Sequence, residues 1–480
     1  MEKTSAAMDD AIPDLQQRAR RARSMAVGIL CIALSGLASC ATLPDIAPPQ
    51  ATGKASPRIV GRRGPLTIEQ SKAILERLGT DAGDDALLKR HTAYEEAISE
   101  SPLIAGNRTR LLRDGPQTFK AMFSAIQGAA NYIDLEYYIF EDVESDGVHL
   151  GDLLIAKRRA GVVVNVIYDS YGSGSTATIF LDRLKQAGVN LTSFNPVDPL
   201  ESKVPYSFND RDHRKILVVD GRTAIIGGVN LSTSYQSNPI GKSAGPPGSS
   251  PDQWRDTDLQ IEGPAVAELQ KLFLSHWSKQ KGPSLDPPAT FSTAPARGNA
   301  VARVLGSTPD NEIPLYYVTL LTAIRTAERS VKITTAYFAP TKQEMEALTQ
   351  AAKRGVDVRL LLPARSDSPL SIAVAHARYS ELLDAGAKIY EMHDVVLHSK
   401  TVVVDGVWSA IGSSNFDHRS VIFNDEVDVI ILGSDAAQEL EDLFQADQAA
   451  AEIIEIRAWK SRPIWMRLKE MYSLAWENLL

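Results

Sequence analysis

The hydrophobic pattern of this chain is built around two short apolar runs, Ile216–Val219 and Thr401–Val404. Both are rich in β-branched residues and are closed by an Asp-Gly turn, so the pattern predicts two buried strands. Each run is preceded by the same order of patterns: helix, strand, helix, glycine, strand, helix, glycine, strand. This alternation predicts α/β sheets flanked by helices.

The segments that precede the two runs also correspond to each other in sequence. The matching pairs are residues 125–140 with 323–338, 156–164 with 352–358, and 184–188 with 382–386. A duplication of this length repeats a whole domain and is too long for a solenoid repeat. We therefore predict an α/β fold of two duplicated domains, each a mixed sheet flanked by helices, which meet at a pseudo-two-fold cleft.

A histidine, a lysine and an asparagine recur at the same positions around both runs. The histidine and lysine lie two residues apart at the start of each strand, so their side chains should point to the same face. The asparagine follows the histidine by 17 residues in both copies. These residues are His213, Lys215 and Asn230 in the first copy, and His398, Lys400 and Asn415 in the second.

These residue types suit chemistry at phosphorus. A neutral imidazole can attack phosphorus or protonate a leaving alkoxide near pH 7. A lysine and an asparagine amide supply donors for the phosphoryl oxygens, where charge builds up in the transition state. One histidine cannot be nucleophile and general acid in the same step, so the two copies together make one complete site.

The pattern H-x-K-x4-D-x6-G-[GS]-x-N, present twice, resembles the HKD signature of the phospholipase D superfamily. Within it, Phe208–Lys215, Ser101–Asn107 and Ala336–Pro340 are most similar to bacterial cardiolipin synthases. Two departures stand out. Gly228 occupies a position where many members have serine, and a targeting segment replaces the amino-terminal transmembrane helices of many cardiolipin synthases.

The resemblance implies a phospholipase D-like fold for each domain and a role for each motif residue. His213 would be the nucleophile that forms a phosphatidyl-histidine, and His398 would protonate the departing alcohol and deprotonate the incoming one. Asp220 and Asp405 complete the catalytic motif, with an expected structural part in the turns after the strands. The residues implied to hold the phosphoryl oxygens are Lys215, Lys400, Asn230, Asn415 and Ser413.

Acidic residues follow the two motifs at comparable points and lead into apolar strands. Asp256 and Glu426 are our candidates for orienting a histidine, of the same or the opposing half, and for stabilising its imidazolium. The alternative is a pair of solvated carboxylates at the start of a strand.

The pattern also predicts the domain boundaries. The first three predicted segments are a lipoprotein signal peptide at 1–39, a flexible tether at 40–65 and a helical prelude at 66–103. A first phospholipase D-like domain at 104–285 and a second at 301–456 are joined by a proline-rich linker at 286–300. The last segment is a Trp/basic C-terminal segment at 457–480. The prelude is expected to be a packed segment that precedes the first domain, with its His91 at the surface.

The N-terminal segment has the order of a targeting signal. A basic region at residues 18–23 precedes an apolar run, Met25–Gly36, that is too short to span a membrane comfortably. The following Leu37–Cys40 resembles a bacterial lipobox, which implies lipidation of Cys40. Ala41 after the cysteine, by analogy with enteric lipoproteins, implies sorting to the outer membrane facing the periplasm. An uncleaved anchor or a plain secretory signal remains the alternative.

The net charge and the cysteine and histidine positions limit which partners and cofactors are expected. A net charge of −8 disfavours a dedicated nucleic-acid binder, which usually has a basic excess. The two cysteines, Cys31 and Cys40, lie near the N-terminus and leave the rest of the chain without a disulfide framework. The histidines outside the motifs show no metal-ligand spacing. We therefore expect neither a metal nor another cofactor.

Two further segments have two interpretations each. The loop Ser237–Asp252, rich in proline and glycine, either covers the first half-site or is a tolerated surface insertion. The C-terminal segment combines tryptophans with basic residues, which suits a membrane interface, but a closing helix packed on the second domain fits equally.

The function expected from this resemblance is transfer of a phosphatidyl group between phospholipids, with phosphatidylglycerol as substrate and cardiolipin as product. A hydrolytic phospholipase D has the same chemistry with water as acceptor. An exported phosphodiesterase or nuclease is a third class, which the acidic balance and the lipobox disfavour. A non-catalytic scaffold would need a degraded motif, and both motifs are intact.

Overall fold

The computed structural model describes residues 58–79, 83–96, 101–199, 209–236, 253–285, 294–311 and 313–480, together with residues 202, 204 and 207. The predicted signal peptide, residues 40–57 of the tether, the loop Ser237–Asp252 and residues 286–293 of the linker lie outside the described residues.

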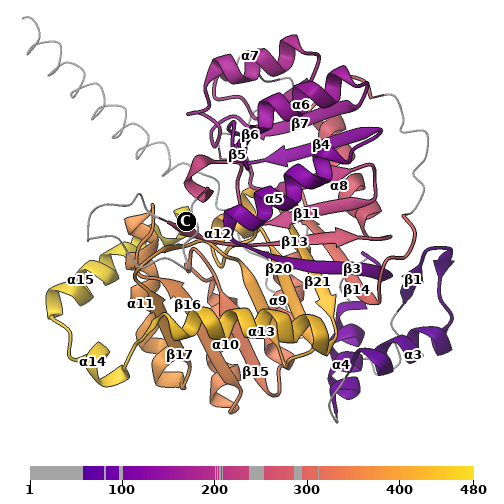
Figure 1. Cartoon of the computed structure of the whole chain (residues 1–480). Coiled ribbons are helices and arrows are strands. Elements are labelled where there is room, and N and C mark those ends of the chain that lie inside the picture. The colour runs from indigo at the N-terminus through magenta and orange to yellow at the C-terminus, as the bar shows by residue number, and fades with distance from the viewer. Residues whose placement is uncertain are drawn as a thin grey trace, which may run out of the picture. The chain divides into compact units, whose positions relative to one another are not determined.

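Each half of the chain forms a mixed sheet with the same strand order (Figure 1). In the first half the order is β8 (Asn190–Phe194), β7 (Val163–Asp169), β4 (Tyr132–Tyr137), β10 (Lys215–Val219), β11 (Thr223–Gly227), β13 (Thr257–Glu262) and β3 (Leu103–Arg113). In the second half it is β17 (Lys388–Met392), β16 (Asp357–Pro363), β15 (Ser330–Thr334), β19 (Thr401–Val404), β20 (Trp408–Gly412), β21 (Asn424–Leu432) and β14 (Ala300–Ser307). The first three strands of each series are parallel and the later pairings are antiparallel, so the predicted duplicated α/β fold is confirmed.

The two apolar runs of the sequence form β10 and β19, each in the middle of its sheet. Each strand ends in a tight hairpin turn. In the first turn Asp220 and Gly221 both have positive φ, at 51° and 60°, and the second turn repeats this geometry. Such a turn matches the right-handed twist of the strands that it joins, and Asp-Gly suits it because Asp tolerates this backbone conformation and Gly adopts it freely.

Alternation along β10 divides its apolar side chains between two cores. Leu217 and Val219 pack in one core with helices α5 (Asp114–Gln127), α6 (Leu150–Arg159) and α7 (Thr178–Gln186). Ile216 and Val218 face the other way, into a core with helix α8 (Val266–Lys279) and strands of the second sheet. The two halves therefore share a hydrophobic core, to which β20 and β21 contribute from the second half.

Helices also cover the second sheet. Val402 and Val404 of β19 pack in a core that includes residues of α9 (Leu315–Thr326), α10 (Lys342–Lys353) and α11 (Pro369–Ala385). Val403 points to the opposite face and packs on α13 (Ser434–Ala449). In addition, β3 pairs with β14, which joins the two sheets edge to edge.

The predicted helical prelude contains two helices, α3 (Ile68–Leu78) and α4 (Asp84–Glu96), preceded by the short hairpin β1 (Ile59–Gly61) and β2 (Gly64–Pro65). The two helices precede the first domain in the sequence but pack on the second half. Leu75, Leu87 and Leu88 belong to the core of the second half. Asp84 forms an ion pair with Arg329, 2.7 Å long, at the start of the second sheet.

The C-terminal segment continues from α13 through a short strand, β22 (Glu452–Ile453), which pairs with β17. It then forms α14 (Ile456–Lys460), α15 (Ile464–Ser473) and the 3-10 helix η3 (Leu474–Leu479). Among the helices that the structure describes, each is too short or too polar to cross a membrane.

Candidate active site

Two short parallel strand pairings hold each motif against the opposite half of the chain. β9 (Arg211–Asp212) precedes the first motif and pairs with β21 of the second half. β18 (Val396–Leu397) precedes the second motif and pairs with β12 (Trp254–Arg255) of the first half. Because β21 contains Glu426 and β12 is followed directly by Asp256, each pairing brings a histidine beside a carboxylate of the other half.

The side chains complete this crosswise arrangement. Nδ1 of His213 lies 3.0 Å from Oε2 of Glu426, and Nδ1 of His398 lies 2.7 Å from Oδ2 of Asp256. Both carboxylates are fully buried, so the interpretation of solvated carboxylates is wrong. A carboxylate accepts the Nδ1–H, which leaves the lone pair of Nε2 for chemistry.

The two lysines of the motifs are buried beside the histidines. Nζ of Lys215 donates to the backbone carbonyl of His213 at 2.6 Å and lies 5.4 Å from the ring centre of Tyr138. Nζ of Lys400 lies 2.9 Å from Nδ1 of His398 and donates to its backbone carbonyl. Both lysines therefore point to the same place as the histidines, as strand alternation predicted.

Burial shifts the pKa values of the two lysines and the two histidines. It lowers the pKa of Lys215 to about 7 and that of Lys400 to about 8, and the charge of Lys400 lowers the pKa of Lys215 further because like charges repel. Burial also lowers the pKa of His213, against the opposing effect of Glu426. The pKa of His398 falls well below its usual value, through burial and the charges of both lysines. Both imidazoles are neutral near pH 7 in the absence of substrate.

The carboxylates that contact the two histidines differ in their pKa values. Burial raises the pKa of Asp256 to about 6. Burial alone would also raise the pKa of Glu426, but His213 and Lys215 outweigh it and hold this pKa below its usual value. The Glu426 carboxylate is thus the more firmly ionised of the two, and it lies beside His213.

The two asparagines are placed differently. The Asn230 amide donates to the hydroxyl of Tyr235 at 3.3 Å, and this hydroxyl lies 3.0 Å from Nδ1 of His398. Asn415 lines a cavity together with His213, and its Oδ1 has no hydrogen-bond partner. The structure therefore brings Asn415 to the cavity wall, whereas Asn230 is bonded to a tyrosine.

Ser413 and Gly228 occupy equivalent positions in the two halves, with different contacts. The Ser413 hydroxyl donates to Oε2 of Glu426 at 2.5 Å and accepts a bond from the backbone N–H of Val427 at 3.0 Å. A Cβ at Gly228 would lie only 2.1 Å from Oδ1 of Asp256. The absence of a side chain at Gly228 therefore leaves space for the Asp256 carboxylate, whereas the Ser413 hydroxyl is directed at Glu426.

Asp220 and Asp405, which complete the two motifs, lie at the far ends of the motif strands. Asp220 accepts backbone N–H bonds of 2.8–2.9 Å from residues 130–132, at the start of β4. Asp405 accepts corresponding bonds from residues 328–330, at the start of β15. Both carboxylates tie the turn after a motif strand to the beginning of its neighbour, which agrees with the expected structural part.

His91 is buried, contrary to expectation. We expected a surface residue, but its side chain is 1% exposed and its Nε2 lies 3.2 Å from Oδ2 of Asp405. This contact fastens α4 to the turn after β19.

A cavity of about 230 Å³ opens beside His213. Two arginines, Arg211 and Arg419, and two acids, Asp367 and Asp417, lie in its wall with Tyr337. The C-terminal residue Leu480 also lines it, and its backbone carbonyl accepts a bond from the N–H of Arg419 at 2.9 Å. Basic side chains around a reactive histidine suit a phosphate-bearing ligand.

Aromatic residues that the sequence did not single out surround the histidines. Tyr138 packs edge-on against His213, with ring centres 5.3 Å apart. Trp254 and Tyr235 pack on His398 at 5.1 and 5.9 Å. These rings restrict the orientation of both imidazoles. Their hydrophobic pattern is that of ordinary core residues, so only the assembled fold reveals the contacts.

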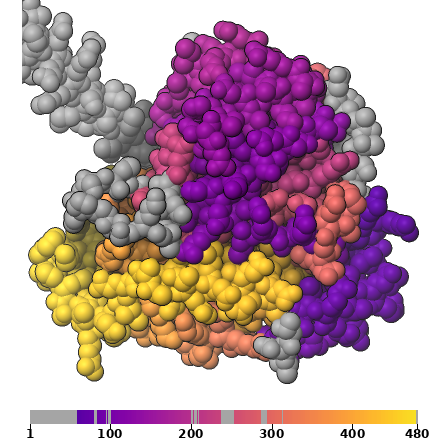
Figure 2. Space-filling view, viewed as in Figure 1, coloured from indigo at the N-terminus to yellow at the C-terminus, as the bar shows by residue number. Residues whose placement is uncertain are grey.

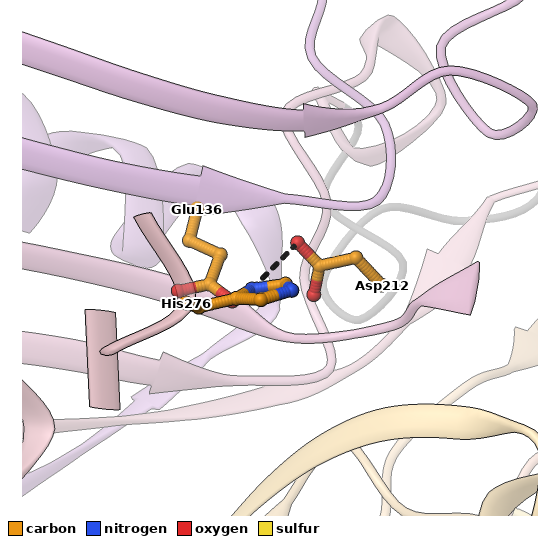
Figure 3. A group of neighbouring side chains, drawn as sticks. All are labelled: Glu136, Asp212 and His276. Carbon is orange, nitrogen blue, oxygen red and sulfur yellow. Dashed lines mark hydrogen bonds and ion pairs between the residues drawn. The ribbon is translucent and has the colours of Figure 1, made fainter. Parts of the chain in front are cut away.

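A second group of buried ionisable side chains (Figure 3) includes Asp212, the residue directly before His213. Glu136, Asp212 and His276 lie within 4.8 Å of one another, close enough to share a metal ion. Nδ1 of His276 is 2.6 Å from Oε1 of Glu136, and Nη1 of Arg214 lies 3.3 Å from the same oxygen. Oε2 of Glu136, Oδ2 of Asp212 and Nε2 of His276 have no hydrogen-bond partner. Spacing along the sequence did not reveal this group, because its members lie far apart in the chain.

The family described as "Cardiolipin synthase, PLD-like domain" matches residues 122–239 and 320–448. The chain belongs to this family. The two matched segments contain one histidine motif each, which confirms both the resemblance and the duplication. Glu426 lies inside the second segment, whereas its counterpart Asp256 follows the first.

Relatives within the family are similar over most of their length. The cardiolipin synthase of Geobacillus kaustophilus (strain HTA426) is 34% identical over 417 residues, which cover 86% of this chain and 79% of the relative. Cardiolipin synthase 2 of Bacillus anthracis is 32% identical over 414 residues, which cover 83% of this chain and 77% of the relative.

A solved structure shares the fold at low sequence identity. The phosphatidylserine synthase of Haemophilus influenzae Rd KW20 superposes with a TM-score of 0.61 at 12% identity, covering 82% of this chain and all of that one. This likeness supports the fold alone.

Proposed function

We propose that this protein is a cardiolipin synthase, which transfers a phosphatidyl group from one phospholipid to a hydroxyl group of a second one. The observation that carries the proposal is the crosswise site, in which His213 and His398 are each bonded to a carboxylate of the other half. The similarity to curated cardiolipin synthases over most of the chain selects this reaction among those that such a site can catalyse.

In the first half-reaction, Nε2 of His213 attacks the phosphorus of phosphatidylglycerol. The bond between phosphorus and the glycerol oxygen breaks, and this oxygen takes a proton from His398, so that glycerol leaves. Glu426 stabilises the charge that develops on His213. The anionic phosphate between Lys215 and Lys400 offsets their charges and raises the pKa of His398, which allows it to act as the acid.

In the second half-reaction, the hydroxyl of another phosphatidylglycerol attacks the same phosphorus. It gives its proton to His398 while the bond between phosphorus and His213 breaks, which yields cardiolipin and the free enzyme. Lys215, Lys400 and Asn415 donate to the phosphoryl oxygens in both steps. Ser413 holds Glu426, and Asn230 holds Tyr235 against His398, so both are positioning residues.

The acceptor distinguishes this reaction from phospholipase D hydrolysis, which uses the same intermediate. Arg211 and Arg419 in the cavity beside His213 suit the phosphate of a second lipid, which water does not carry. Binding an acceptor through its phosphate places its hydroxyl near the intermediate and displaces water.

The test uses purified protein and mixed vesicles that contain phosphatidylglycerol in excess. Cardiolipin should form faster than phosphatidic acid, and Arg419→Gln should shift the ratio of products toward phosphatidic acid. Lys342→Gln, which removes a well-exposed lysine from α10, is the control and should leave the ratio unchanged. Phosphatidic acid as the main product of the unaltered protein would identify a phospholipase D instead.

The proposed setting is the bacterial envelope, with the protein anchored by a lipid on Cys40 and sorted to the outer membrane. The lipobox-like Leu37–Cys40 and the following Ala41 support this setting, although they lie outside the described residues. Cys40→Ser should abolish lipidation and leave an uncleaved precursor. Normal maturation of this variant, with retention in the outer membrane, would refute the anchor.

A further inference from the structure

Helix α15 exposes an unusual concentration of large apolar side chains. Those that are at least half exposed are Ile464 (73%), Trp465 (60%), Leu468 (56%), Met471 (66%) and Tyr472 (70%). An exposed apolar surface of this kind marks a site of interaction with a partner protein or a membrane.

These side chains share one face of the helix. At 100° per residue, Ile464, Trp465, Leu468, Met471 and Tyr472 fall within an arc of about 120°. Glu470 and Ser473 are buried and project from the opposite side. Glu470 pairs there with Arg462. The helix therefore rests on the protein through its polar side and turns its apolar side outward.

Basic residues border the apolar arc on both sides. By the same helical spacing, Arg467 lies about 40° beyond Met471 and Lys469 about 40° beyond Trp465. Both side chains are exposed, and neither has an ion-pair partner among the described residues. Long basic side chains at the edges of an apolar face reach the lipid phosphates while the apolar side chains enter the acyl region.

A short segment of the chain connects α15, which carries the apolar face, to the wall of the active-site cavity. Helix α15 passes directly into η3, and the chain then ends at Leu480 in the wall of the cavity beside His213. Nearby, Arg378 of α11 pairs with Glu477 of η3, which fixes this connection to the second half. In Figures 1 and 2 the helices α14 and α15 form one edge of the described molecule, shown in yellow.

We propose that α15 is a membrane-docking helix that inserts its apolar face into an anionic phospholipid bilayer and brings the cavity beside His213 to the lipid surface. The proposal rests on the proposed function, because an enzyme that acts on phospholipids must take both substrates from a bilayer. A bilayer is favoured over a protein partner because Arg467 and Lys469 flank the apolar arc, whereas the chain as a whole carries a net charge of −8.

The test measures binding to vesicles of the chain from Ala41 onward, so that neither the apolar run Met25–Gly36 nor a lipid on Cys40 contributes. Vesicles of phosphatidylcholine alone are compared with vesicles of phosphatidylcholine and phosphatidylglycerol in equal parts. Leu468→Ser/Met471→Ser should weaken binding to both kinds by at least about tenfold, since two apolar side chains lose their burial in lipid. Arg467→Gln/Lys469→Gln should remove the preference for the anionic vesicles.

Ile179→Ser is the matched control, since Ile179 is 72% exposed on α7 of the first half. It should bind like the unaltered protein. Equal binding by Leu468→Ser/Met471→Ser and the control would overturn the proposal. So would a dimer in solution that this double substitution separates, because the face would then be an interface between two copies of the chain.

A turnover assay separates this proposal from the proposed function. With monomeric short-chain phosphatidylglycerol, Leu468→Ser/Met471→Ser should retain the turnover of the unaltered protein, and it should lose turnover only on vesicles. Absence of any product from the unaltered protein would refute the proposed function, while the binding measurement would still decide whether α15 docks on lipid.

Discussion

Oε2 of Glu426, in the second half of the chain, lies 3.0 Å from Nδ1 of His213, in the first half. The reverse contact, Asp256 of the first half with His398 of the second, is 2.7 Å long. Each half therefore supplies a histidine and the carboxylate that contacts the other half's histidine. Neither half contains a complete histidine–carboxylate pair, so the proposed mechanism requires the motif to occur twice.

Removal of either carboxylate charge should impair catalysis without unfolding the protein. Glu426→Gln and Asp256→Asn keep the shape of the side chain. The amides no longer stabilise a protonated histidine, and they no longer fix the tautomer of the neutral one. We expect turnover to fall by about 100-fold or more. The measurement is steady-state cardiolipin formation together with the thermal midpoint of each variant. Glu346→Gln, at a half-exposed residue of α10, is the control, and an equally small effect in all three variants would contradict the orienting roles.

The repeated pattern predicted β10, β19 and the duplicated sheets because these depend on local properties: apolar runs, turn residues and their order. It could not decide whether Glu426 orients a histidine of its own half or of the other. That choice depends on β9 pairing with β21, a contact between residues more than 200 positions apart. His91 was misplaced for the same reason, because its partner Asp405 lies in another part of the chain.

The tyrosine beside His398 shows a further limit of sequence analysis. Tyr235 is indistinguishable from a core residue in the hydrophobic pattern, and its contact with His398 depends on the packing of the two halves. Gly228 is a contrasting case. The sequence showed that glycine replaces the serine found in many relatives at this position. Only the structure gives the reason, because a Cβ at Gly228 would lie 2.1 Å from Oδ1 of Asp256.

The alkaline side of the pH profile should report the two buried lysines. In the proposed mechanism Lys215 and Lys400 bind phosphate as cations, and burial lowers their pKa values to about 7 and about 8. They lose their charges as the pH rises through these values, so kcat/KM should fall between about pH 7 and about pH 9. Bound phosphate stabilises the charged lysines, so the same fall in kcat should occur at higher pH. A kcat/KM that stays constant across this range would contradict the lysine assignment.

The acid side of the profile depends on His213, which must be neutral to attack phosphorus. Burial lowers its pKa below the ordinary value, and protonation occurs only as the pH falls through this lowered pKa. Activity should therefore persist to a lower pH than an unperturbed imidazole, with a pKa of about 6.5, would allow. Loss of kcat/KM at or above that pH would be inconsistent with the buried histidine.

Asp405→Ala should reduce stability rather than catalysis. The substitution removes the acceptor for the backbone N–H groups of residues 328–330 and for His91, at a carboxylate that is 2% exposed. We expect the free energy of unfolding to fall by about 3 kcal/mol, since buried donors lose their partners. Activity per folded molecule should be unchanged. Asp182→Ala, at an exposed position of α7, is the control for chemical denaturation.

Removal of divalent ions should leave turnover intact, because histidines carry out every proton transfer in the proposed mechanism. The measurement is cardiolipin formation after exhaustive treatment with EDTA. Loss of activity that one divalent ion restores would contradict this expectation. The group of Glu136, Asp212 and His276 would then be the candidate metal site, and His276→Gln should abolish the restoration of activity.

The central claim is that His213 carries the phosphatidyl group between the two lipids, and the most direct measurement is the mass of the covalent intermediate. His398→Ala, incubated with phosphatidylglycerol and quenched in alkali to preserve phosphohistidine, should accumulate protein heavier by one phosphatidyl group, with the added mass on the peptide that contains His213. His213→Ala should show no adduct and no turnover. An adduct on any other residue, or substantial cardiolipin formation by folded His213→Ala, would contradict the account.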